Sequence, residues 1–123
     1  VRVWESTNEM NQPPFRAPLN VEQAVRFVIE SARGVKDAGS DFWIGTNMGG
    51  MNDLAKSMYR SIYAADVAWD YVGVDGYFGT WEEGGPHTWH ETFDWLDELA
   101  GLPVIHFIKM PQKILSFLLV WTK

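Results

Sequence analysis

The most constraining feature of this sequence is a repeated alternation between short apolar runs and longer amphipathic stretches. Four runs rich in β-branched and aromatic residues have the composition of strands. Between them, three stretches carry apolar residues every three or four positions, which is the spacing of one helical face. The order β-α-β-α-β-α-β predicts parallel strands joined by right-handed crossovers. The predicted strands are residues 1–4, 42–45, 71–74 and 102–105.

Polar residues and glycines mark where the three helices should begin and end. Asn20 followed by Gln23 has the pattern of a capping box, and Thr88 followed by Glu91 repeats it for the third helix. Such pairs satisfy backbone N–H groups that have no partner within the helix. Residues 46–51 should form a glycine-rich turn before the second helix. The other expected helix boundaries are Gly39, Asn52 or Asp53, and Gly101.

Two α/β architectures fit this alternation, an open doubly wound sheet and a slice of a closed (β/α)8 barrel. Periodicity alone does not separate them. A complete barrel needs about 250 residues, whereas this chain has 123 and opens on Val1 rather than on a methionine. We therefore expect residues 1–105 to be a partial barrel domain taken from a longer protein. Residues 106–123 do not continue the alternation and form an atypical apolar tail.

Composition removes several classes of function. The net charge is −6 and there is no run of Lys or Arg, so a nucleic-acid partner is not expected. The longest apolar run, residues 114–121, is far shorter than the roughly 20 residues that span a bilayer, so no membrane partner is expected either. Cysteine is absent, which excludes disulfides and thiolate chemistry. The compartment is left open, with secretion of the longer protein as one alternative.

Side chains suited to catalysis or binding follow each predicted strand, where the sites of parallel α/β folds collect. They are carboxylates, amides and aromatic rings, without a phosphate-binding glycine loop or a Ser-His-Asp arrangement. The pair His87 and His90 lacks a third ligand, so we expect no metal and no cofactor. Among seven tryptophans, Trp81 is the best candidate for stacking on a sugar, while Trp89 and Trp95 should pack in the core. The strand-end residues are Asn8, Glu9, Thr46, Asn47, Asp75, Tyr77, Trp81 and His106.

The opening segment, which ends in Ser6-Thr7-Asn8-Glu9, resembles the fourth strand of the large clan of retaining (β/α)8 glycoside hydrolases, a group that includes cellulases and mannanases. The resemblance continues over strands four to seven, as far as Leu-Pro-Val-Ile at residues 102–105. It implies that Glu9 is the acid/base and that Asn8 binds the sugar 2-hydroxyl. It also implies hydrolysis of a β-linked polysaccharide. Tyr77 then supports the nucleophile, and Asn47 and Trp81 are further substrate-binding candidates.

The same resemblance places a nucleophilic Glu two or three residues past Ile105, where this sequence has Phe107 and Ile108. Retaining hydrolysis requires two carboxyl groups, and no Asp or Glu follows Glu98. We therefore expect this chain alone to be inactive, with a tail that is foreign to the family. A partial barrel also has open strand edges, through which copies could associate. The alternative is a non-catalytic carbohydrate-binding or interaction domain built on an open α/β sheet.

Overall fold

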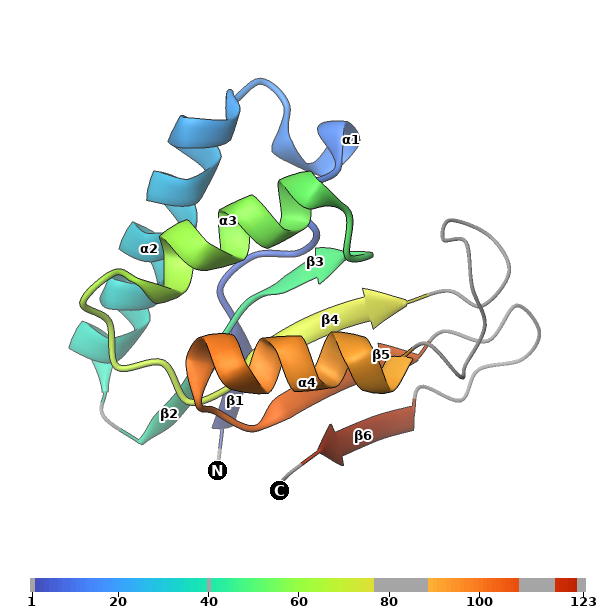
Figure 1. Cartoon of the computed structure of the whole chain (residues 1–123). Coiled ribbons are helices and arrows are strands. Elements are labelled where there is room, and N and C mark those ends of the chain that lie inside the picture. The colour runs from blue at the N-terminus through green and yellow to red at the C-terminus, as the bar shows by residue number, and fades with distance from the viewer. Residues whose placement is uncertain (1, 40, 77–88, 109–116, 122–123) are drawn as a thin grey trace.

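A computed structural model describes residues 2–39, 41–76, 89–108 and 117–121, and shows a mixed α/β fold (Figure 1). The described part of the chain alternates strands with helices, as the sequence pattern predicts. The elements are β1 (Arg2–Glu5), α1 (Pro13–Arg16), α2 (Val21–Ala38), β2 (Phe42–Gly45), β3 (Asn47–Gly49), α3 (Asp53–Tyr63), β4 (Val72–Gly76), α4 (Trp89–Ala100), β5 (Val104–Ile108) and β6 (Phe117–Trp121).

The strands form two small sheets whose neighbours follow the order of the chain. β1 pairs with β2 in parallel, and in the second sheet β3 pairs with β4 and β4 with β5, again in parallel. Only Thr46 separates β2 from β3, and its carbonyl accepts a hydrogen bond of 2.9 Å from the amide of Gly73. The prediction of parallel α/β architecture is therefore confirmed.

Local capping signals fix the helix ends largely where the sequence indicates. The side chain of Asn20 accepts from the Gln23 amide at 2.9 Å, and the Gln23 side chain accepts from the Asn20 amide at the same distance. Asn52, rather than Asp53, caps α3 by accepting from the Ala55 amide. Gly101 follows α4 with φ of 60°, a left-handed conformation that glycine adopts without steric cost. The predicted cap at Thr88 lies outside the described residues.

The helices form a single layer, because α2 packs against α3 and α3 packs against α4 (Figure 1). Their apolar faces meet one face of the strands. Val28, Met58 and Leu96, one from each long helix, are buried in the same cluster as strand residues. The strand residues of this cluster are Ile44, Met48, Val72, Val74 and Val104. The opposite face of the strands is left for the polar residues described below.

Three expectations about the strands are wrong in detail. Residues 46–51 are not all turn, since Asn47–Gly49 form β3 and the turn begins only at Gly50, where φ is 74°. The fourth predicted strand begins at Val104 and runs to Ile108, past the expected boundary at Ile105. The tail contributes β6, which pairs with β5 in antiparallel orientation and covers an edge that was expected to be open. An antiparallel strand at this place is not part of a (β/α)8 pattern.

Buried tyrosines tie the strands together behind the polar face. The Tyr59 hydroxyl, from α3, donates to the carbonyl of Gly73 and accepts from the amide of Met48 at 2.9 Å. The Tyr71 hydroxyl donates to the carbonyl of Trp4 at 2.9 Å. Burial raises the pKa of Tyr59 and of Tyr63 well above the ordinary value of 10.0, because desolvation penalises the phenolate. Both hydroxyls therefore stay protonated as hydrogen-bond donors.

Candidate functional site

The segment after β1 is fastened to β3 by a reciprocal amide pair. The Asn11 side chain donates to the carbonyl of Gly49 at 2.8 Å and accepts from the amide of the same residue at 2.9 Å. Gln12 adds a second donor to that carbonyl at 3.0 Å. Asn11 thus imitates a neighbouring strand beyond the end of β1. This pairing holds residues 8–12 against the carboxyl end of β3.

Glu9 lies in this segment with a backbone conformation that is unusual for a side chain of its kind. Its φ is 48°, in the left-handed region, which costs a non-glycine residue roughly 1–2 kcal/mol. The conformation is held by a hydrogen bond of 2.9 Å from the Glu9 amide to Oδ1 of Asn47. A strained backbone that the surroundings enforce is typical of functional positions.

The Glu9 carboxylate is removed from solvent, with the residue only 2% exposed. Within the described part of the chain, its Oε1 is buried and has no hydrogen-bond partner. A buried carboxylate oxygen without a donor is costly. Such an oxygen is suited to accept a hydrogen bond from a hydroxyl group of a ligand.

Asn47, the first residue of β3, connects that strand to the segment around Glu9. While its Oδ1 accepts from the Glu9 amide, its Nδ2 donates to Oδ1 of Asn8 at 3.3 Å. Thr46 and Thr7, one residue earlier on each segment, share a hydroxyl hydrogen bond of 3.0 Å. Asn47 and Thr46 are buried. The predicted residues Asn8, Glu9 and Asn47 are therefore brought together into one polar cluster.

Gly49 provides the space in which the Glu9 carboxyl lies. A Cβ at this position would stand 3.0 Å from Cδ and 3.2 Å from Oε2 of Glu9. Asp75 is the register partner of Gly49 on β4, and it is also buried, with 6% exposed. Its carbonyl accepts a hydrogen bond of 2.9 Å from the Gly50 amide. The segment after β1 and the end of β4 thus place two buried carboxyl groups in one region beside Gly49.

The remaining predicted residues have different outcomes. Tyr77 and Trp81 lie outside the described residues, so their proposed roles stay predictions. Trp89 and Trp95 pack as expected, since Trp89 is buried against Phe93, with ring centroids 5.9 Å apart, and Trp95 packs against the core. Asn11 and Gly49 were missed as site residues. The only available sequence signal was the polar stretch after Glu9, because the pairing partner lies 38 residues away.

The charges near the cluster are mainly negative. The buried polar residues described are Glu9, Asn11, Thr46, Asn47 and Asp75, none of them basic. The Arg16 guanidinium donates to the backbone carbonyls of Met10 and Asn11, at 3.4 Å and 3.0 Å. Within the described ranges, no three acidic, histidine or cysteine side chains gather as a metal site. No described helix has the length and apolarity to cross a bilayer.

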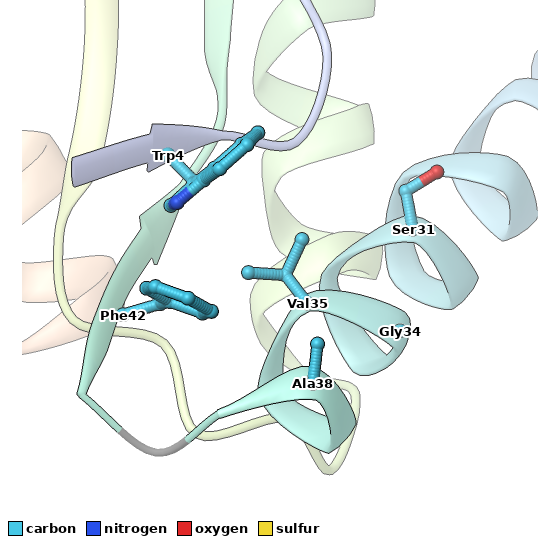
Figure 2. A pocket seen from close by; sticks show the side chains of 6 residues that line it. All are labelled: Trp4, Ser31, Gly34, Val35, Ala38 and Phe42. Atoms are coloured by element: carbon cyan, nitrogen blue, oxygen red, sulfur yellow. The ribbon is translucent and has the colours of Figure 1, made fainter. Parts of the chain in front are cut away.

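A hollow lies between the strands β1 and β2 and the helix α2 (Figure 2). It has a volume of about 390 Å³ and shares no residue with the Glu9 cluster. Trp4 and Phe42 form the strand side of the hollow and meet edge to face, with ring centroids 6.0 Å apart (Figure 2). The Ser31 hydroxyl and the Trp4 indole N–H are the polar side-chain groups among its lining residues, which are Trp4, Ser31, Gly34, Val35, Ala38 and Phe42. This groove is apolar and lacks the acid and amide groups of the Glu9 cluster.

Comparisons with protein-family models, with curated proteins and with solved structures each found no match to this chain. The fold defines the chain as an α/β protein with parallel strands.

Proposed function

We propose that the chain is part of a retaining glycoside hydrolase that acts on a β-linked polysaccharide, with Glu9 as its acid/base. The observation that carries the proposal is the buried Glu9 carboxylate, which lies in the segment that follows the parallel strand β1 and has Oε1 unpartnered in the described structure. Asn8 and Asn47 flank it with amide groups. Paired amides beside a desolvated carboxyl group suit the binding of sugar hydroxyls and proton transfer to a glycosidic oxygen.

The arrangement of the strands supports a slice of a (β/α)8 barrel. In a doubly wound sheet the strand order reverses at a switch point and helices cover both faces. Here the parallel strands follow the chain order, and consecutive helices pack against one another in one layer. Large apolar side chains are exposed around β1, β2 and α2, among them Trp4, Phe27 and Trp43. A preceding β-α unit of a barrel would cover that side.

In this proposal Glu9 gives its proton to the leaving glycosidic oxygen and later takes one from the attacking water. Asn8 binds the sugar 2-hydroxyl, and Asn47 positions Glu9 through the backbone hydrogen bond described above. Retaining hydrolysis also requires a nucleophilic carboxylate about 5 Å from the acid. Its expected position near the end of β5 is occupied by Phe107 and Ile108, which carry no carboxyl group. The chain alone therefore should not turn over.

An external nucleophile tests this assignment. The complete chain is incubated with phenyl β-glucoside and phenyl β-mannoside, with and without sodium formate. Formate attacks the anomeric carbon, the bond to the phenolic oxygen breaks, and Glu9 protonates that oxygen. Phenol is a poor leaving group, so its release depends on the proton donor. We expect phenol release only when formate is present, and its loss in Glu9→Gln.

Glu22→Gln provides the matched control, because it removes the same charge from an exposed site in the first turn of α2. Its formate-dependent rate should equal that of the unaltered chain. Turnover that persists in Glu9→Gln, or no formate-dependent turnover in the unaltered chain, contradicts the proposal.

One observation favours the alternative of a non-catalytic carbohydrate-binding or interaction domain. β6 pairs with β5 along five residues, so the chain itself covers an edge that a barrel would use for its next parallel strand. Sugar binding without formate-dependent turnover would select this alternative. Association of copies through the outer edges of β1 and β6 remains a proposal, and sedimentation at several concentrations measures it directly.

A further inference from the structure

The position of Asp75 relative to Glu9 follows from the register of β3 and β4. Gly49 and Asp75 are register partners in a parallel pair, and partners in parallel strands direct their Cβ atoms to the same face. At Gly49 that direction points at the Glu9 carboxyl, since a Cβ there would lie 3.0 Å from Cδ of Glu9. The Asp75 side chain therefore lies on the face that holds the Glu9 carboxyl, one strand away, or about 4.8 Å at the backbone.

The same reasoning separates this face from the apolar core. Met48 and Val74 are also register partners, and both belong to the cluster covered by the helices. Asn47 and Gly49 alternate with Met48, so they lie on the other face with Asp75. Asn47 confirms the direction, because its side chain reaches the Glu9 amide. One face of these strands is thus apolar, and the other carries two buried carboxylates and an amide.

Two buried carboxyl groups on one face of the strands select for the charge of a ligand that binds between them. Each carboxyl group can accept a hydrogen bond from a ligand donor, and a further negative group is repelled by even one ionised carboxylate in a poorly solvated site. The buried polar residues described here include no Lys, Arg or His that could neutralise an anion. Sugar hydroxyls are uncharged hydrogen-bond donors. One of them can donate to Oε1 of Glu9, which has no hydrogen-bond partner among the described residues.

We infer that Asp75 is a further ligand-binding residue of the Glu9 site, and that the pair of carboxylates makes the site select an uncharged, hydroxyl-rich sugar over a uronic acid. This inference rests on the proposed function and specifies its substrate class. Asp75 contributes binding and selection, while the proton transfer belongs to Glu9.

The test compares two sugars that differ only in charge. The ¹⁵N-labelled complete chain is titrated with methyl β-glucoside and with methyl β-glucuronide, and with the corresponding manno pair. The amide of Gly50, which donates to the Asp75 carbonyl, reports binding at this place. We expect the unaltered chain to bind a neutral sugar at least about tenfold more tightly than its uronate, equivalent to the loss of one charge-assisted hydrogen bond.

Asp75→Asn should weaken binding of the neutral sugar about tenfold and narrow the preference over the uronate, since it keeps the shape and removes one charge. Asp66→Asn is the control, because Asp66 is exposed in the connection that precedes β4, at the opposite end of that strand from Asp75. It should change neither value. The preference of the unaltered chain for the neutral sugar over the uronate is measured without any variant. If Asp75→Asn fails to fold, this comparison still tests the inference.

The outcomes separate the inference from the proposed function. Equal affinity for the neutral sugar and its uronate overturns the role of Asp75 and leaves Glu9 as a sugar-binding acid. The same conclusion follows if Asp75→Asn binds the sugar unchanged while Glu9→Gln abolishes binding. No binding of any of the four sugars to the unaltered chain overturns both.

Discussion

Gly45, at the end of β2, should not tolerate even one added methyl group. A Cβ there would lie 2.5 Å from two carbons of the Tyr71 ring and 2.6 Å from a third, whereas ordinary contact begins at 3.4 Å. Tyr71 is fully buried, and its hydroxyl donates to the carbonyl of Trp4 at 2.9 Å. The ring therefore cannot move away without losing that hydrogen bond and disturbing the junction of β1 and β2, from which Glu9 extends.

The expected cost of Gly45→Ala follows from these contacts. Relieving the overlap moves the ring by roughly 1 Å, and overpacking of this kind costs about 1–3 kcal/mol. Loss of the Tyr71 hydrogen bond adds about 1 kcal/mol. We expect the free energy of unfolding to fall by about 2–4 kcal/mol, measured by urea denaturation with tryptophan fluorescence. An alanine that left stability within about 0.5 kcal/mol of the unaltered chain would refute the packing described here.

The matched control is Gly34→Ala, the same substitution with the opposite expected effect on the free energy of unfolding. Gly34 lies within α2, and a Cβ there meets nothing within 4 Å. Alanine in a helix interior is favoured over glycine by roughly 0.5–1 kcal/mol. Gly34→Ala should therefore raise the urea midpoint, with an unchanged dependence on urea. A loss of stability would show that the face of α2 around Gly34 is packed differently.

Three further predictions concern the site, the tyrosines and the first helix. Asn47→Ala leaves the Glu9 amide without its acceptor in a buried place and should cost about 1–3 kcal/mol in urea denaturation; an unchanged midpoint would contradict the link. Burial raises the pKa of Tyr59 and Tyr63 above 10.0, so an unfolded tyrosine loses its proton at a lower pH than a folded one. The free energy of unfolding should keep its full value below about pH 10 and fall above it by up to about 1.4 kcal/mol per pH unit for each tyrosine. In Tyr59→Phe this decrease with pH should be shallower. Asn20→Ala removes the capping box of α2 and should lower the unfolding free energy by about 1 kcal/mol, whereas no change would mean that the box contributes nothing in solution.

The helix boundaries could be predicted because their causes are local. The Asn20 side chain reaches an amide three residues away, and Asn52 does the same. Gly101 could be predicted to end its helix because the residue after a helix often takes the left-handed conformation that glycine adopts readily. None of these interactions depends on where the rest of the chain lies.

The ends of the strands and the detail of the site could not be predicted, because their partners are distant in sequence. Residues 47–49 have a composition typical of turns, yet pairing with Gly73 and Asp75 makes them a strand. The left-handed backbone of Glu9 depends on Asn47, which is 38 residues away. The apolar run at residues 114–121 was visible in the sequence, but its antiparallel pairing with β5 was not.

The most direct test of the central claim is affinity labelling, which identifies the carboxylate that reacts with a sugar carrying a reactive group. The complete chain is incubated with an epoxyalkyl β-glucoside, in which a carboxylate opens the epoxide and forms an ester, and the labelled residue is located by peptide mass spectrometry. The chain has 16 Asp and Glu residues, and Glu9 is 2% exposed, so reaction governed by exposure alone would label it among the last. We predict labelling at Glu9, suppressed by an excess of methyl β-glucoside. Labelling confined to exposed carboxylates such as Glu22, and insensitive to the free sugar, would contradict the assignment of Glu9 as the acid of a sugar site.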